Sequence, residues 1–144
     1  MAYATYAEVQ SEFRNTTFAS GKPVTPDEVN DWLDEFSALI DGRITKKFAL
    51  PVSDASLLLV LKLVCKSFVA ARIKRILNAD DMDANTKENS DADKLEKMAK
   101  QILDDIMSGK ITFTDAAKSA IAVLSSYNVR EDKDPKWEMD VDQW

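Results

Sequence analysis

Apolar residues recur at steps of three and four through the middle of the chain, which is the period of one face of an α-helix. The residues that share this face between positions 29 and 44 are Val29, Trp32, Leu33, Phe36, Leu39, Ile40 and Ile44. Thr25-Pro26-Asp27-Glu28 has the spacing of a capping box, with proline at the first helical position, where its missing N–H costs nothing. We therefore expect a helix from about residue 26 to about Lys47.

Gly42 lies inside this predicted helix, where a glycine costs about 1 kcal/mol relative to alanine. Two explanations would account for it: the helix is kinked at this point, or another backbone approaches it closely. Of the two we expect the close approach.

A second helix in this region is almost wholly apolar. Phe48-Ala49-Leu50-Pro51 ends the preceding helix, and Ser53-Asp54 can cap the next one, which is expected to reach about Asn78. Its apolar residues are Leu57 to Leu61, Leu63, Val64, Phe68, Val69, Ile73, Ile76 and Leu77. Because they leave little polar surface, this helix is expected to lie in the middle of the fold.

Two outer helices are predicted beside this pair. Thr5-Tyr6-Ala7-Glu8 is a second capping box and predicts a short helix to about Arg14, followed by a loop over residues 15–24. Asp80 to Asp93 carries six carboxylates and one lysine and is expected to be a polar loop, from which Asp91 caps a helix that ends at Gly109. The apolar face of that helix is Leu95, Met98, Ala99, Ile102, Leu103, Ile106 and Met107.

The last part of the chain is less regular. Ile111-Thr112-Phe113 alternates like a short extended piece, residues 115–124 predict a weaker helix, and the sequence beyond Ser125 is polar. The predicted fold is all-α, a small bundle of four to five helices over residues 1–124 with an extended C-terminal tail over residues 125–144. The composition agrees, because three glycines and four prolines in 144 residues are too few for sandwiches or barrels, which turn about every ten residues.

Most catalytic chemistry is excluded by composition. The chain has no histidine and one cysteine, which removes Ser-His-Asp and Cys-His arrangements and the usual zinc sites. It also has no glycine-rich phosphate loop. Carboxylate pairs of the glycosidase kind stay open, since any two of 25 acidic residues can converge. We expect no enzymatic activity, no metal ion and no cofactor.

Two motifs resemble reactive or ligand-binding sites. Asp81-Met82-Asp83-Ala84-Asn85 imitates the start of a calcium loop, but Thr86 stands where the loop needs glycine and Ala92 where it needs a bidentate glutamate. This segment is therefore interpreted as a solvated acidic loop. Cys65 lies within an apolar helical run and is interpreted as a small core residue rather than a reactive thiol.

The charge and the N-terminus limit the partners and the compartment. A formal net charge of −6 disfavours general affinity for nucleic acid. The single cysteine cannot form an intrachain disulfide, and Met1-Ala2-Tyr3-Ala4 lacks the basic-then-apolar profile of a signal peptide. Lys62 and Lys66 interrupt the best candidate for a membrane span. We expect synthesis in the cytoplasm and no contact with a membrane.

A basic group on the third predicted helix is the first candidate for binding a partner. It consists of Lys62, Lys66, Arg72, Lys74 and Arg75. These side chains are either solvated along snorkelling stems, or they face a partner or the acidic segments of a neighbouring subunit.

The tail is the second candidate. The segment from Arg130 to Trp144 has too little apolar material to fold alone, yet it holds two of the three tryptophans of the chain. Trp137 and Trp144 are therefore expected to anchor in pockets of another chain, with Tyr127 and Arg130 beside them. The alternative is that the tryptophans fold back over the core of their own domain.

The order of these features resembles a known family. Its motifs in this chain are Tyr3-Ala4-Thr5-Tyr6-Ala7-Glu8-Val9 with Phe13, Ser37-Ala38-Leu39-Ile40-Asp41-Gly42, Phe48-Ala49-Leu50-Pro51 and an apolar helix with a basic end, and Ile102-Leu103-Asp104-Asp105-Ile106-Met107-Ser108-Gly109-Lys110-Ile111. In this order and spacing they are similar to the Mu-type head-tail connectors of tailed phages and prophages, over about residues 3–113. The acidic segment from Asp80 to Asp93 and the alanine-rich segment 115–124 depart from that pattern.

The resemblance implies a function without catalysis. Connectors of this family are small helical bundles that form a ring of identical subunits, usually dodecameric, under the portal of the capsid. The ring joins the portal to a stopper or tail-completion protein and lets DNA pass, for which an acidic wall is suitable. The C-terminal segment of such adaptors commonly extends toward the portal, which here corresponds to residues 125–144. The expected location is the virion, at the portal vertex.

A different class of function stays open on the residues alone. The five bases of the third predicted helix would suit a small DNA-binding or regulatory domain that contacts phosphates. Two features disfavour a DNA-binding function: the negative net charge of the chain, and the absence of a recognisable glycine turn of the helix-turn-helix kind.

Overall fold

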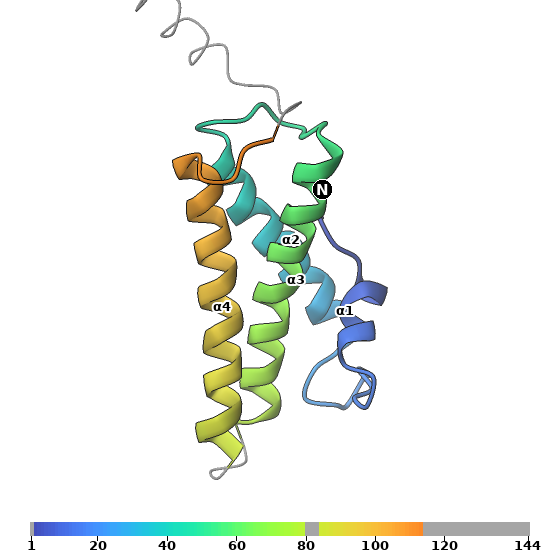
Figure 1. Cartoon of the computed structure of the whole chain (residues 1–144). Helices are drawn as coiled ribbons and strands as arrows, with labels where there is room; N and C mark the ends of the chain where they lie inside the picture. Colours follow the sequence, from blue (N-terminus) through green and yellow to red (C-terminus); the bar gives the residue numbers. More distant parts are fainter. Residues whose placement is uncertain (1, 80–83, 114–144) are drawn as a thin grey trace, which may run out of the picture.

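Four helices form the structure, a computed structural model that describes residues 2–79 and 84–113 (Figure 1). They are α1 (Tyr6–Glu12), α2 (Pro26–Ile44), α3 (Ala55–Leu77) and α4 (Ala84–Ser108). α3 and α4 run antiparallel side by side, α2 crosses behind α3, and α1 lies against α2 and α3 on the side away from α4. The predicted all-α class is confirmed. The predicted helix over residues 115–124 and the tail over residues 125–144 lie outside the described residues.

The helix starts follow the capping signals in the sequence. Thr5 and Thr25 each accept a hydrogen bond from the backbone N–H three residues later, and Glu8 and Glu28 accept from the backbone N–H of those threonines in return. Asp54 caps α3 by accepting from the N–H of Leu57 at 2.8 Å. Because each cap is built from residues adjacent in sequence, local chemistry is sufficient to place these starts.

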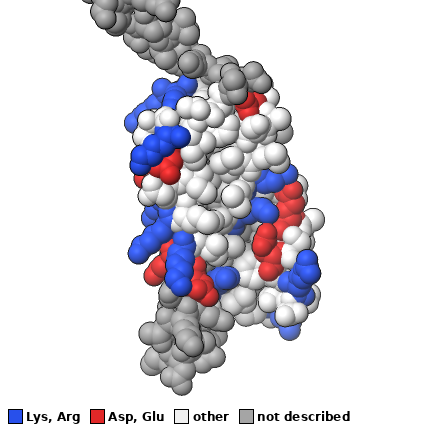
Figure 2. Space-filling view, viewed as in Figure 1, with Lys and Arg blue, Asp and Glu red and all other residues white. Residues whose placement is uncertain are grey.

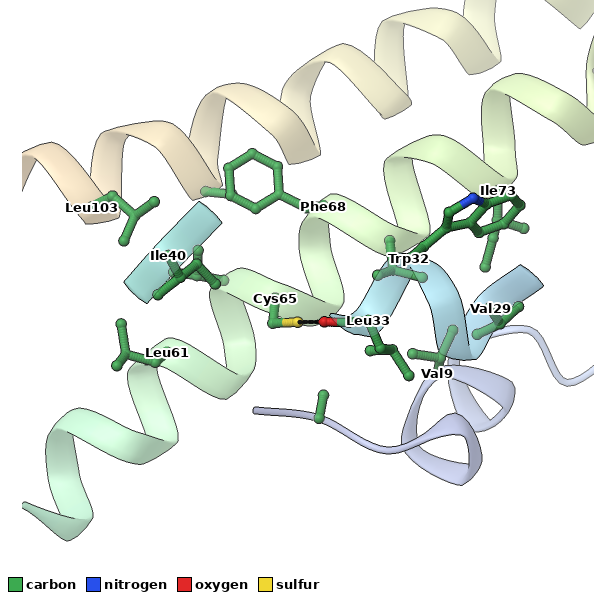
Figure 3. Close-up of a cluster of buried hydrophobic side chains, with 14 of the residues drawn as sticks. Val9, Val29, Trp32, Leu33, Ile40, Leu61, Cys65, Phe68, Ile73 and Leu103 are labelled. Carbon is green, nitrogen blue, oxygen red and sulfur yellow. Dashed lines mark hydrogen bonds between the residues drawn. The ribbon is translucent and has the colours of Figure 1, made fainter. Parts of the chain in front are cut away.

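The core is centred on α3, which packs against each of the other helices. Figure 3 shows Phe68 and Leu61 of this helix beside Ile40 of α2 and Leu103 of α4, while Val9 of α1 lies at the opposite end of the cluster. Ile40, Leu61 and Leu103, one residue from each of α2, α3 and α4, are fully buried. The central position expected for the third helix is therefore confirmed.

The end of α2 differs by one turn from the expected one. The helix ends at Ile44 rather than near Lys47, because Lys47 and Phe48 both donate their backbone N–H to the carbonyl of Ile44 in a tight turn. This turn buries the ring of Phe48 in the core. The next segment contains a cis peptide bond between Leu50 and Pro51 and leads into α3.

The predicted polar loop from Asp80 to Asp93 is wrong from Ala84 onward, since α4 begins there and Asp91 lies inside it rather than capping it. Ala92 is fully buried and lies seven residues before the buried Ala99, so it continues the same helix face. The first turns of α4 lack large apolar residues, so hydrophobic periodicity gave no signal for them. A twelve-residue calcium loop starting at Asp81 is incompatible with this helix.

The close backbone approach expected at Gly42 is also wrong. This glycine is exposed in the last turn of α2, and a Cβ atom built on it would meet no other group within 4 Å. The end of α4 is as predicted: Gly109 follows the helix with φ of +82°, and the N–H of Ile111 donates to the carbonyl of Asp105. The backbone therefore requires glycine at position 109, whereas position 42 has room for a side chain.

Replacement of these two glycines by alanine should change stability in opposite directions. Gly42→Ala should raise the free energy of unfolding by about 0.5 to 1 kcal/mol, because alanine loses less conformational freedom in a helix and the site is open. Gly109→Ala should lower it by about 1 to 2 kcal/mol, because its φ is strained for an L side chain. Urea denaturation measures both. A destabilising Gly42→Ala would show that its surroundings are closed.

Candidate functional surfaces

Two lysines of the basic group join α3 to α1. Lys62 Nζ lies 2.7 Å from the Glu8 carboxylate, and Lys66 Nζ lies 3.2 Å from that of Glu12. Lys62 and Glu8 are both about one-third exposed. Since these cations already have acidic partners within the chain, their role in the described fold is to hold α1 against the first half of α3.

The other bases lie on the second half of α3. Arg72 pairs with Glu35 at 2.9 Å, and its guanidinium carbon lies 5.0 Å from the centre of the Trp32 ring, in a cation–π contact. Arg75 contacts Asp93 and Glu96 of α4. Lys74, half-buried in the last turn, carries a positive charge where the helix dipole favours one. The basic group is therefore divided among contacts with α1, α2 and α4.

The tail candidates Tyr127, Arg130, Trp137 and Trp144 lie outside the described residues. In the described ranges, 2–79 and 84–113, no helix has the length and apolar character needed to cross a membrane.

Three leucines on the first half of α3 are exposed, which the sequence pattern did not predict. Leu59 is 66% exposed, Leu63 44% and Leu58 36%, and Figure 2 shows an uncharged surface over this part of the helix. Leu59 and Leu63 are one turn apart on the same side. We call these three residues the leucine face. Exposed apolar side chains grouped on one element are typical of an interaction surface.

A groove of about 460 Å³ lies between α2, α3 and α4. Its lining residues are Phe36, Leu39, Arg43, Phe68, Arg72, Arg75, Glu96, Lys100 and Leu103. The rings of Phe36 and Phe68 stack in it with centroids 5.2 Å apart. Leu39 was expected in the core but is 49% exposed, because its side chain lines this open groove. Sequence reasoning missed Arg43 and Lys100, since only the fold brings them to one groove.

Three charged residues of the groove, Arg75, Glu96 and Lys100, form a connected network. Glu96 accepts hydrogen bonds from Lys100 at 2.6 Å and from Arg75, and these two cations lower its pKa, Lys100 more strongly. Hydrogen bonds to Asp93 and then Glu96 raise the pKa of Arg75. On the opposite wall Arg43 lies 3.2 Å from Asp104. The groove thus combines an apolar floor with a rim of four cations and one carboxylate.

A chain of polar contacts fixes the N-terminal segment against α2. Ser37 Oγ accepts from the backbone N–H of Tyr3 at 3.0 Å and lies 3.6 Å from Cys65 Sγ, while the Tyr3 hydroxyl donates to Asp41. Burial raises the pKa of the Cys65 thiol. The pKa of the Tyr3 hydroxyl is also raised, chiefly by burial and next by its hydrogen bond to Asp41. The thiol is enclosed and protonated, so the interpretation of Cys65 as a core residue is confirmed.

No family model, no curated protein and no solved structure matches this chain. Function is therefore inferred from the residues and the surfaces described above.

The contribution of the Glu8–Lys62 pair to the free energy of unfolding depends on pH. The pKa of Glu8 is lowered from its ordinary 4.5, chiefly by the hydrogen bond from Lys62 and next by that from the Thr5 backbone. Because the pKa of Glu8 is lowered in the folded state, its charged form stabilises the fold above about pH 4.5. This stabilisation is lost as the pH falls through the pKa of Glu8 in the folded protein. Glu8→Gln keeps the capping-box spacing and removes only the charge.

We expect Glu8→Gln to be less stable than the wild type at pH 7 by less than about 1 kcal/mol, since the pair is partly exposed. The difference should disappear in acid. Urea denaturation over a pH series measures this, with Lys62→Gln and the double variant completing the cycle. Equal losses at every pH would show that Glu8 acts through packing and not through its charge.

Proposed function

We propose that this chain is the head-tail connector subunit of a tailed phage or prophage. It is a structural adaptor that forms a ring, dodecameric in the virion, between the portal and a stopper or tail-completion protein. DNA passes through the ring as cargo, and the subunit performs no catalysis. The chain is made in the host cytoplasm and becomes part of the virion.

One observation carries this proposal: the order and spacing of the motifs that resemble the connector family. In the fold these motifs also pack together. Tyr3 of the first motif donates to Ser37 and Asp41 of the second. Phe48 of the third and Ile111 of the last belong to one core. These contacts place the motifs in one folded unit, and the resemblance itself rests on their order and spacing over residues 3–113.

The leucine face supports the ring. A subunit that assembles needs an apolar contact surface, and Leu58, Leu59 and Leu63 provide one. The bases Lys62 and Lys66, whose acidic partners are on α1 of the same chain, flank that surface. We therefore assign the contact between neighbouring subunits to the leucine face and not to the basic group as a whole.

The net charge and the tail also suit this function. A net charge of −6 repels the phosphates of DNA in transit. The tail from residue 125 to 144, with Trp137 and Trp144 as aromatic anchors, is the segment that we assign to the portal.

Disruption of the leucine face should prevent assembly. Light scattering and negative-stain imaging of the wild type with portal protein should show rings with a mass of up to twelve times the 16.1 kDa of one chain. Leu59→Glu combined with Leu63→Glu should give monomers of unchanged helix content, because both side chains are exposed. Leu39→Glu, an equally exposed position on another side of the fold, is the matched control and should still assemble.

A wild-type protein that stays monomeric even with portal protein would refute the connector function. The neighbouring genes give an independent test, since portal and major capsid genes are expected upstream and tail genes downstream. A DNA-binding domain is the alternative, and a gel shift at rising salt separates the two, because phosphate contacts weaken steeply with salt.

A further inference from the structure

The groove between α2, α3 and α4 has an apolar floor that no described segment covers. Leu39 is 49% exposed there, beside the stacked rings of Phe36 and Phe68 and the side chain of Leu103. Burial of an exposed leucine against such a floor is favourable, at about 25 cal/mol for each Å² of apolar area removed from water. An occupant of the groove must therefore present apolar side chains on one side.

The rim determines the charge of that occupant. Arg43, Arg72, Arg75 and Lys100 line the groove with one acid, Glu96. Their ion pairs within the chain are exposed: in the Arg43–Asp104 pair, the arginine side chain is 49% exposed and the aspartate side chain 66%. Exposed pairs of this kind contribute little to stability. A guanidinium has five N–H donors, so each arginine can bind a further carboxylate without giving up its present one. The rim therefore suits an acidic ligand.

The last eight residues of the chain have this chemistry. Their sequence is Trp137-Glu138-Met139-Asp140-Val141-Asp142-Gln143-Trp144. Through Val141 and Asp142, apolar residues alternate with acidic ones, so an extended conformation would place Trp137, Met139 and Val141 on one side and three carboxylates on the other. The segment thus matches both the floor and the rim of the groove.

The connecting chain is long enough for this segment to reach the groove of its own chain. The described chain ends at Phe113, and a further 23 residues precede Trp137, which span up to about 80 Å when extended. Leu103, at one end of the groove, is five residues before the end of α4, or about 7.5 Å along the helix. Attachment through such a linker gives an effective concentration in the mM range, so a second copy is not needed.

We propose that the groove between α2, α3 and α4 binds the acidic, tryptophan-bearing segment Trp137–Trp144 of the same chain. This goes beyond the connector function and does not depend on ring assembly. Where both hold, the segment assigned to the portal is held on its own subunit before assembly, with its tryptophans sheltered from water and from unproductive contacts.

A peptide that competes with the attached segment tests the proposal in the full chain. Fluorescein-labelled peptide of residues 134–144 is titrated with two proteins, the wild type and a Trp137→Ala/Trp144→Ala variant, and binding is followed by anisotropy. The peptide should bind the variant at least about tenfold more tightly than the wild type, because the wild-type groove is already filled by its own tail. Leu39→Glu in the variant should weaken the peptide about tenfold or more, through loss of an apolar contact and repulsion of the acidic segment.

Leu59→Glu in the same variant is the matched control, because it places the same charge on an exposed leucine outside the groove, and it should leave peptide binding unchanged. Lys100→Glu is a second groove variant, at an exposed position on α4, and should also weaken binding. Circular dichroism checks the helix content of each protein.

Three outcomes would overturn the proposal. The first is absence of peptide binding to the Trp137→Ala/Trp144→Ala variant, and the second is binding that Leu39→Glu and Lys100→Glu leave unchanged. The third is equal affinity for the wild type and the variant, or a difference that appears only at high protein concentration, which would assign the segment to another chain. Because Leu39→Glu tests the groove and Leu59→Glu/Leu63→Glu tests the ring, failure of either proposal is visible without the other.

Discussion

The packing of α3 against the other three helices is the constraint on which the fold depends. This helix carries the largest share of the apolar residues of the chain, and ten of its residues are buried. α1 is too short to be stable alone, and it is held to α3 by packing of Val9 and by pairs with Lys62 and Lys66. α4 pairs along the length of α3 on the other side. α3 therefore supports three neighbouring helices at once.

That constraint also explains where the candidate surfaces lie. Three neighbours do not enclose α3 completely, so Leu58, Leu59 and Leu63 remain uncovered on its first half. The oblique crossing of α2 leaves the groove beside Phe68. Most of the basic residues of α3 are used in pairs with Glu8, Glu12, Glu35, Asp93 and Glu96, so the surfaces that remain for partners are apolar or mixed rather than purely cationic.

Prediction from sequence was most successful where the signal was local. The starts of α1, α2 and α3 follow from caps at Thr5, Thr25 and Asp54, and the end of α4 follows from Gly109. Prediction from sequence failed where the environment of a residue depends on segments distant in sequence. The first turns of α4 contain no large apolar residue to mark them, and the space around Gly42 is set by elements far from it in sequence.

By itself the sequence determined the helical class, the order of the helices, the central position of α3 and the lack of histidine chemistry, because propensity, periodicity and capping act within a few residues. Only the tertiary structure decided which apolar residues stay exposed and which bases become paired. Leu33 and Leu39 lie on the same predicted face of α2, yet one is buried and the other is half exposed in the groove. The crossing of α2 over α3 separates them, and a crossing angle is a property of two packed surfaces that neither helix encodes alone.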